Sequence, residues 1–328
     1  MRKLKILVIF TGGTIDSTAS GGWIAPHDSA RFTLINNYAS NHNGVEFDTL
    51  SPYTILSENL SAEELNKLTA CVRVNAGSYD GIIVTHGTDT LQYTASALSF
   101  TVDCGNTPVV LVSANYPLRN ERSNGNINFE AAVAFIGANA GKGVYVSYKN
   151  PDDAAVHIHY GARVLGHIET MDEVFSIDNQ PYAFYEDGKI TLNTAFEKMR
   201  ISRVSDAKFC AEPKILTVNS RPGDNYKYDV EKYNAILLAP YHSGTLNTAN
   251  DGLMRLCERA QGCGVPVLLA NVRSGDSYES TRSYADLGIT VLPFCGVVQA
   301  YMKIWIAVSR GEDIVKFVKN PLAGEFIN

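Results

Sequence analysis

Residues 83–90 read IVTHGTDT, so a run of β-branched apolar residues ends in a turn of hydroxyls, an imidazole, a glycine and a carboxylate. Ile82, Ile83 and Val84 predict a strand that is buried on both faces, and Leu91–Val102 predicts a helix. The polar turn therefore follows the carboxyl end of a strand. In an open α/β sheet, ligands bind at this end of the strands.

The alternation of apolar strands and helices continues along the chain, which predicts a mostly parallel sheet covered by helices on both faces. The helix that precedes Gly81 begins with SAEE, where Ser61 can cap the helix and Glu64 can complete a capping box. The strands predicted for this first α/β part are Leu4–Phe10, Gly81–Thr85, Pro108–Ser113 and Gly143–Ser147.

The pattern changes in the middle of the chain. Val156–Tyr160 and Ala162–Ile168 predict short β elements, and Asp178–Ala211 is polar and irregular, which indicates an excursion followed by a linker. We predict an N-terminal α/β domain at 1–190, a linker at 191–212 and a smaller C-terminal α/β domain at 213–328. The last domain is predicted to hold strands Lys214–Val218, Ala235–Ala239, Val265–Ala270 and Ile289–Pro293, and helices Asp251–Gln261 and Val297–Arg310.

Composition limits the class of partner. The formal net charge is -6 and there is no Lys/Arg block, which argues against nucleic acid or an anionic membrane surface as the main partner. No apolar run approaches the roughly 20 residues of a membrane helix, and Ile6–Phe10 is shorter than the core of a secretion signal. The six cysteines lie in apolar elements without a CxxC pair, which predicts reduced thiols and no metal site. We therefore expect a cytoplasmic protein with a small-molecule ligand.

The first predicted strand also ends in an unusual turn, IFTGGTID at residues 9–16. Two glycines let the backbone turn tightly and approach a ligand, and the hydroxyl of Thr14 follows them. GxGxxG and GxSxG are both absent, which argues against a dinucleotide site and against a serine hydrolase. A purely structural alternative is that Thr88 or Asp89 caps the helix that follows, and His86 is predicted to be a hydrogen-bonded structural imidazole.

The pairing of TGGTI at 11–15 with HGTDT at 86–90 resembles the bacterial-type asparaginases, which include the glutaminase-asparaginases. The likeness continues through LSENLSAEEL at 56–65 and SANYPLRNERSNGNINFEAA at 113–132, and it covers essentially the whole chain. It is greater to the cytoplasmic branch than to the exported one. The resemblance implies an asparaginase-like fold of two α/β domains, hydrolysis of a side-chain amide, and no metal or organic cofactor.

The resemblance also implies roles for particular residues. Thr14 matches the nucleophile, which attacks the side-chain amide carbon of asparagine and forms an ester that water then cleaves. Thr88 matches the second active-site threonine, and Asp89 matches the residue that holds the α-ammonium group of the substrate. The remaining substrate-binding positions are Ser57 and Glu58, which match the residues holding the α-carboxylate and amino group, and Ala114, near which the backbone faces the amide.

Two positions depart from the family. Trp23 stands where the family has a tyrosine that helps to activate the nucleophile, and an indole has no acceptor for the proton. Gly166 stands where the family has a lysine that assists the second threonine. Acid–base assistance of this kind contributes about 10²–10⁴-fold to rates. His167 and His27 are candidate substitutes; packed or surface imidazoles are the alternative interpretation.

Three hypotheses follow. The first is a cytoplasmic asparaginase that still acts through Thr14, with water or another base in place of the lost groups. The second is an amidase of the same fold with a different substrate, for which Trp23 and Gly166 reshape the pocket. The third is a catalytically impaired protein that binds asparagine or aspartate.

The resemblance further implies a homo-oligomer, a tetramer or a dimer, in which a neighbouring protomer completes each site. The helix predicted at Val297–Arg310 is apolar around most of its circumference and suits either a core or an interface. Tyr241–Thr248, which reads YHSGTLNT, resembles the family segment that reaches the site of the partner.

Overall fold

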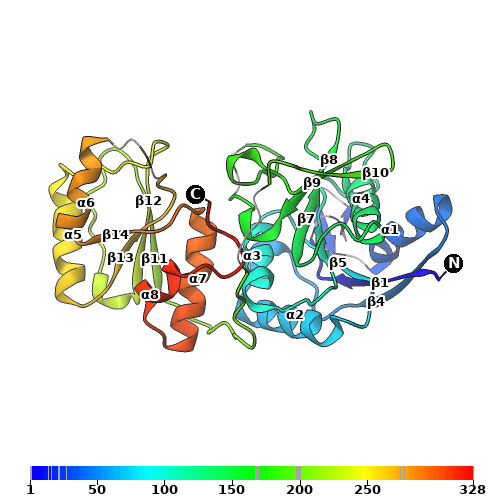
Figure 1. Ribbon diagram of the computed structural model, residues 1–328, viewed down its shortest axis with the longest axis horizontal. Helices are drawn as coiled ribbons and strands as arrows, with labels where there is room; N and C mark the ends of the chain where they lie inside the picture. Colours follow the sequence, from blue (N-terminus) through cyan, green and yellow to red (C-terminus); the bar gives the residue numbers. More distant parts are fainter. Residues whose placement is uncertain are drawn as a thin grey trace. The chain divides into compact units, whose positions relative to one another are not determined.

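The computed structural model describes residues 2–13, 15, 17–20, 23–26, 28–166, 168, 170–196, 201–273, 275 and 278–327, with the backbone alone at 17–20, 23–26 and 28–31. The chain divides into two compact units, Met1–Met199 with Arg203–Asp206, and Arg200–Ser202 with Ala207–Asn328 (Figure 1). The domain and linker boundaries given above stay predictions.

The first unit is built on an eight-stranded sheet with the order β10-β9-β8-β7-β6-β5-β1-β4. The pairs β4–β1, β1–β5, β5–β6 and β6–β7 are parallel. The pairs β7–β8, β8–β9 and β9–β10 are antiparallel. The sheet is therefore mostly parallel, as predicted. Its strands are β1 Leu4–Phe10, β4 Val45–Leu50, β5 Gly81–Thr85, β6 Val109–Val112, β7 Val144–Tyr148, β8 Val156–Tyr160, β9 Ala183–Glu186 and β10 Lys189–Leu192.

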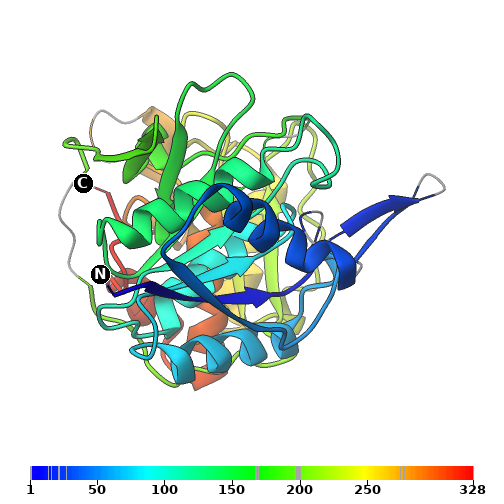
Figure 2. The same cartoon turned by 90° about the vertical axis from the view of Figure 1, so that its right-hand side faces the viewer.

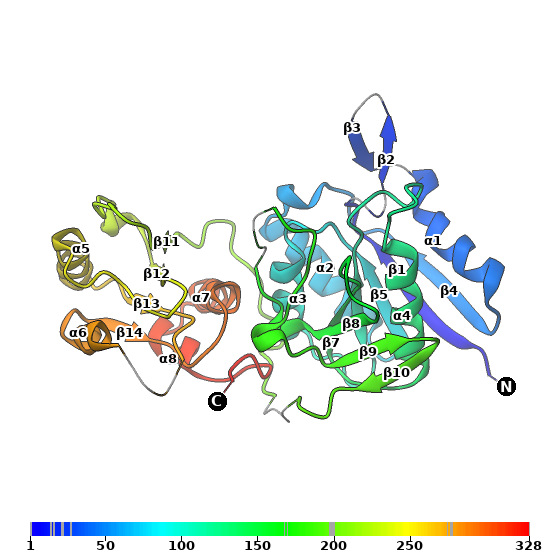
Figure 3. The ribbon, with the colours of Figure 1, turned by 90° about the horizontal axis from the view of Figure 1, so that it is seen from above.

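Helices cover both faces of this sheet, as Figure 3 shows. On one face lie α2, Ala62–Asn75, and α3, Leu91–Thr101; on the other lie α1, Asp28–Asn41, and α4, Gly125–Gly137. Burial on both faces explains why the central strands are apolar throughout, and every residue of β5 is buried. The parallel strands end at one edge of the sheet, where the turns after β1, β5, β6 and β7 meet.

The predicted cap of α2 is confirmed. The Ser61 hydroxyl accepts a hydrogen bond from the Glu63 amide at 3.2 Å and donates one to the Glu64 carboxylate. This hydroxyl is the main reason why the pKa of Glu64 is lowered from its ordinary value. The cap fixes the start of α2 just after the segment that carries Ser57.

A separate hairpin follows β1. It consists of β2, Ser17–Ser20, and β3, Trp23–Pro26, which pair antiparallel with Ser20 opposite Trp23. Figure 2 shows the hairpin projecting from the first unit. Trp23 therefore lies at the start of the second hairpin strand.

The second unit holds a four-stranded parallel sheet with the order β11-β12-β13-β14. Helices α5 and α6 pack on one face of this sheet, and α7 and α8 pack on the other (Figure 1). For the four strands and for α5 and α7, observed and predicted bounds agree within two residues, whereas α6 and α8 were not predicted. The elements are β11 Ile215–Asn219, β12 Ala235–Ala239, β13 Val267–Leu269, β14 Ile289–Val291, α5 Asp251–Gly262, α6 Ser283–Asp286, α7 Val297–Arg310 and α8 Ile314–Lys319.

Two predictions about the middle of the chain are wrong. Ala162–Ile168 is not a β element: Gly161–Arg163 forms a 3-10 turn, and Val164 makes an isolated bridge with Ser176. Ala162 and Val164 are buried, and the 3-10 turn packs against α3 instead of extending a sheet. The segment described as irregular after Asp178 contains β9 and β10, joined by Asp187 and Gly188, which both have positive φ. This is the hairpin signature of Asp-Gly, and the exposed edge strand β10 carries little apolar signal.

None of the helices in the described part of the chain combines the length and apolarity that a membrane crossing requires.

Candidate active site

The turns after β1 and β5 lie against each other at the carboxyl edge of the large sheet. Gly12 forms a parallel bridge with Ile55, and the Gly13 amide donates to the Ile55 carbonyl at 3.0 Å. Gly13 has a φ of 83°, and a Cβ added to it would lie 2.3 Å from the backbone nitrogen of Gly87. Only glycine permits this approach, so the GG and HG pairs of the two motifs form one backbone contact.

Thr14, the predicted nucleophile, lies outside the described residues, as do His27 and His167. Its neighbours are described: Gly13 contacts the turn after β5, and Ile15 is fully buried.

A second contact joins the LSEN segment to the same turn. Ser57 is buried in a short 3-10 turn, Ser57–Asn59, and its hydroxyl donates to Oδ2 of Asp89 at 3.3 Å. The Thr90 hydroxyl donates to the Ser57 carbonyl at 2.8 Å. Glu58 is exposed beside Ser57, and Asp89 is exposed. The site residues predicted at 57–58 and 88–89 are thus brought together from distant parts of the chain.

His86 is a structural imidazole, in agreement with the prediction. Nδ1 lies 2.7 Å from the Gly87 carbonyl, to which it donates, and Nε2 lies 2.8 Å from the Thr94 hydroxyl, from which it accepts. Burial lowers the pKa of His86 to about 4, so the ring is neutral at neutral pH. Both ring nitrogens are engaged in shaping the turn, so His86 does not serve as a base.

The turn after β6 adds Ala114 and Asn115. Ala114 is fully buried, and Asn115 exchanges two hydrogen bonds with Asn124, in which each backbone amide donates to the side-chain oxygen of the other residue, at 3.0 and 3.1 Å. The Asn124 amide group also donates to the Lys149 carbonyl at 2.8 Å, which ties this turn to the end of β7. The backbone around Ala114 is therefore held rigidly at the site edge.

A cavity of about 490 Å³ opens at these turns. Thr88, Asp89, Asn115 and Tyr148 line it from the strand ends, and Ile168 with residues 170–174 forms a further wall. Asn115, Tyr148 and this wall were not predicted from the sequence. The signal that finds Thr88, a polar residue at the carboxyl end of a strand, also applies to Asn115 and Tyr148.

The wall is held by hydrogen bonds to the end of β7. The Tyr148 hydroxyl donates to the Asp172 carbonyl at 2.8 Å, and Asn150 pairs with both backbone groups of Val174 at 2.9 and 3.2 Å. Burial raises the pKa of Tyr148 to about 12, so its hydroxyl stays protonated at neutral pH. Gly166, at the start of this segment, is exposed and carries no side chain toward the cavity.

The described residues contain no group of His, Cys, Asp and Glu side chains able to hold a metal ion. All six cysteines are free thiols.

Comparisons with known proteins agree with this arrangement. A family model described as "Asparaginase, N-terminal" matches residues 5–197. A glutamyl-tRNA(Gln) amidotransferase subunit of Methanosphaera stadtmanae is 28% identical over 346 residues, which span 99% of this chain and 77% of that protein. L-asparaginase 1 of Escherichia coli strain K12 is 34% identical over 145 residues, 42% of either protein.

Solved structures extend the similarity to the whole fold. L-asparaginase I from Vibrio cholerae superimposes with a TM-score of 0.80 at 22% identity, covering 100% of both chains. The thermostable L-asparaginase from Thermococcus kodakarensis gives 0.79 at 23% identity, covering 99% of this chain and 100% of the other. At such identities the similarity concerns the fold alone, and the predicted asparaginase-like α/β fold is confirmed.

Proposed function

Since the chain belongs to the asparaginase family of amidohydrolases, we propose that it hydrolyses the side-chain amide of an amino-acid substrate through Thr14. The observation that carries the proposal is the contact between Gly13 and Gly87, which joins the threonine-bearing turns after β1 and β5. The Ser57 to Asp89 hydrogen bond supports it, because the residues proposed for the substrate's charged end lie at that same junction.

In this mechanism the Thr14 hydroxyl attacks the amide carbon, the C–N bond breaks, and ammonia leaves with the transferred proton. Water then cleaves the resulting ester and regenerates the hydroxyl. Asp89 would hold the α-ammonium group, and Ser57, which orients that carboxylate, would turn its hydroxyl to the α-carboxylate. Backbone near Ala114 would face the oxyanion, and its rigidity suits the role, because donors that are already positioned need no reorganisation.

The preferred substrate is proposed to differ from free L-asparagine. Trp23 and Gly166 replace the tyrosine and lysine expected of an asparaginase, whereas Ser57, Thr88 and Asp89 match the family. L-glutamine is one candidate, because relatives that match nearly the whole chain are named as glutamyl-tRNA(Gln) amidotransferase subunits. The second candidate is an amide larger than L-asparagine or L-glutamine, because a cavity of about 490 Å³ falls in the range of pockets for drug-sized ligands.

We propose no described side chain of the cavity as a replacement for the lysine in proton transfer. Tyr148 keeps its proton near neutral pH and would act as a hydrogen-bond donor. Water is therefore the proposed base for Thr14.

Ammonia release from L-asparagine and L-glutamine tests the proposal, with Thr14→Ala and Asp89→Asn as paired variants. We expect turnover of at least one amide by the wild-type protein, complete loss in Thr14→Ala, and a raised KM in Asp89→Asn. Calorimetric binding of L-aspartate or L-asparagine without turnover of either amide would instead identify an impaired binding protein. Turnover that survives in Thr14→Ala would refute the nucleophile.

The assembly and the location of the protein remain proposals. A homotetramer or homodimer follows from the family resemblance, whereas the amidotransferase relatives are named as subunits, which raises a partner of a different chain. Light scattering on the purified chain distinguishes a homo-oligomer from a monomer that awaits such a partner. Six free thiols suit the proposed cytoplasmic location, where thiols stay reduced.

A further inference from the structure

Two exposed apolar side chains stand at the cavity that holds Thr88 and Asp89. Ile168 is 48% exposed and Met171 is 44% exposed, and both line this cavity. The Met171 amide donates to the Ile168 carbonyl at 3.3 Å across a turn in which Thr170 has a φ of 67°. The backbones of the first and last residues of such a turn lie close together, and we call these two exposed apolar side chains of the cavity wall, Ile168 and Met171, the apolar patch.

This patch is held in place. Thr170 is β-branched, and a positive φ is a strained conformation for such a residue, which persists only when its surroundings impose it. The bonds from Tyr148 to Asp172 and from Asn150 to Val174 fix the segment directly after the turn. The apolar patch is thus part of a preformed wall.

The charges of the cavity also favour a substituent that is not anionic. Asp89, Asp172 and Glu173 line it, and none of its described lining residues is basic. An additional anionic group on the substrate would face carboxylates without a compensating cation, whereas an uncharged or cationic group would not.

Resting on the proposed amide hydrolysis, we propose that the preferred substrate carries an apolar, non-anionic substituent on its side-chain amide nitrogen, and that Ile168 and Met171 bind this substituent. The substituent is assigned to the amide nitrogen because acylation of the α-amino group would remove the positive charge that Asp89 is proposed to hold. The same C–N bond breaks as Thr14 takes the acyl group, and a primary amine leaves in place of ammonia with the Thr14 proton. Water then cleaves the ester, supplying the hydroxyl of the acid and the hydrogen that restores Thr14.

The test compares kcat/KM for L-asparagine with that for two derivatives substituted on the side-chain amide, one benzyl and one carboxymethyl. The corresponding L-glutamine set is measured in parallel. For the parent amide that the wild-type protein hydrolyses, we expect the benzyl derivative to be favoured about tenfold, the order of magnitude that a small apolar contact gives in a pocket. The carboxymethyl derivative should be hydrolysed less efficiently than the parent.

Variants then locate the effect. Met171→Ser should lower the benzyl-to-parent ratio several-fold, because Ile168 alone then contacts the substituent. Asp172→Asn with Glu173→Gln should raise kcat/KM for the carboxymethyl derivative several-fold. The matched control is Leu192→Ser on the edge strand β10, a side chain that is 50% exposed and lies outside the described cavity lining. It should leave the ratio unchanged.

The outcomes separate the two proposals. Turnover of a parent amide with a benzyl-to-parent ratio at or below one overturns this inference and leaves the proposed function intact. An unchanged ratio in Met171→Ser overturns it too; if light scattering then shows a smaller assembly, the patch is a contact between copies of the chain. Absence of turnover with every amide overturns both proposals.

Discussion

The backbones of Gly13 and Gly87 lie so close together that a methyl group on Gly13 would reach within 2.3 Å of the Gly87 nitrogen. Gly87 is restricted as well, because a Cβ there would lie 2.4 Å from the Ser57 hydroxyl oxygen. Three segments that carry predicted site residues thus meet at a point where neither glycine can bear a side chain. The close packing makes the geometry of the site sensitive to a single added carbon.

Gly13→Ala should therefore unfold more easily than the wild type and lose amide turnover. Positive φ alone costs a residue such as alanine about 1–2 kcal/mol, and the collision with Gly87 adds to this cost. The control is Gly188→Ala, where φ is also positive, at 78°, but where nothing lies within 4 Å of the added carbon. Urea unfolding measures both variants. Equal losses of stability would show that the collision is relieved by a backbone shift.

The pH dependence of stability should carry the signature of His86. Its pKa in the folded chain is about 4, below the ordinary value of 6.5, so the folded state binds fewer protons than the unfolded state between these values. The stabilisation is present above pH 6.5 and is lost as the pH falls toward 4. The free energy of unfolding falls by about 3 kcal/mol over this range. His86→Asn should be less stable at pH 7.5 and should show a shallower decline between pH 6.5 and 4.

Another neutral imidazole does not disturb this comparison. Burial lowers the pKa of His159 to about 3, and its contribution to the pH slope is common to both proteins. Parallel pH curves for the wild type and His86→Asn would contradict the assignment of His86 as a buried neutral ring.

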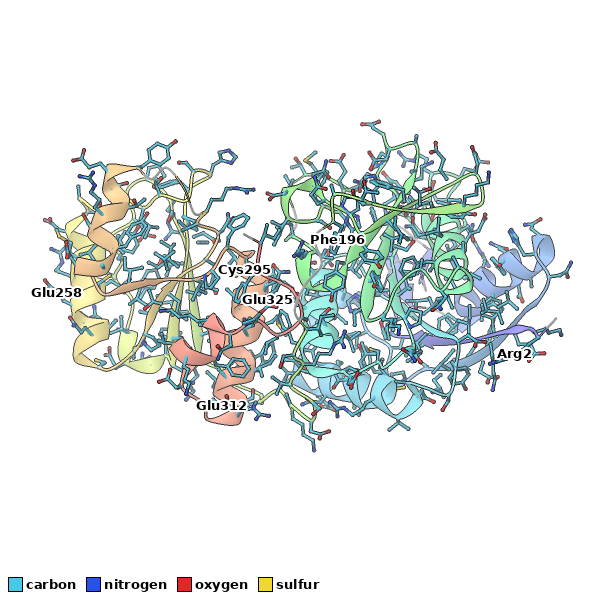
Figure 4. All side chains as sticks on the ribbon, viewed as in Figure 1. Arg2, Phe196, Glu258, Cys295, Glu312 and Glu325 are labelled. Atoms are coloured by element: carbon cyan, nitrogen blue, oxygen red, sulfur yellow. The ribbon has the colours of Figure 1, made fainter. Side chains whose placement is uncertain are left out.

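In the second unit, stability should depend on the buried ion pair between Lys303 of α7 and Glu325 of the C-terminal segment. Figure 4 labels Glu325. Lys303 is 1% exposed and Glu325 is fully buried, and the Lys303 ammonium donates to Glu325 Oε1 at 2.5 Å. Lys303→Met leaves this carboxylate without its cation, which typically costs about 3–5 kcal/mol.

The control for this prediction is Lys232→Met, which breaks an exposed pair with Asp229 at 2.6 Å in the same unit. Exposed pairs contribute little to stability, because water and salt screen them. This variant should therefore unfold at a temperature close to that of the wild type. Thermal unfolding compares the two. A small effect in both variants would mean that Glu325 is satisfied by the Leu322 and Ala323 amides that also donate to it.

The features predicted from sequence are those that local pattern determines. Buried β-branched runs such as Ile82–Val84 identify central strands, and Ser61 with Glu64 identifies the start of α2. Strands β4, β9 and β10 are not predicted because edge or partly exposed strands need no continuous apolar run.

The same reasoning explains which part of the candidate site is visible in the sequence. Thr88 and Asp89 follow a recognisable strand, so their place at the sheet edge can be predicted. The wall formed by Ile168 and residues 170–174 has no periodic pattern of its own. It is positioned by Tyr148 and Asn150, each bonded to a residue 24 positions away, and such long-range bonds leave no local signature.

The last prediction concerns the two departures from the family. Trp23→Tyr with Gly166→Lys should raise L-asparagine turnover, because the phenol and the amine restore groups that can move a proton where an indole and a hydrogen atom cannot. The ceiling for such assistance is about 10²–10⁴-fold. Trp23→Phe with Gly166→Met supplies similar bulk without acid–base groups and serves as the control. If both double variants bind L-aspartate like the wild type and neither gains turnover, the slow step does not depend on these missing groups.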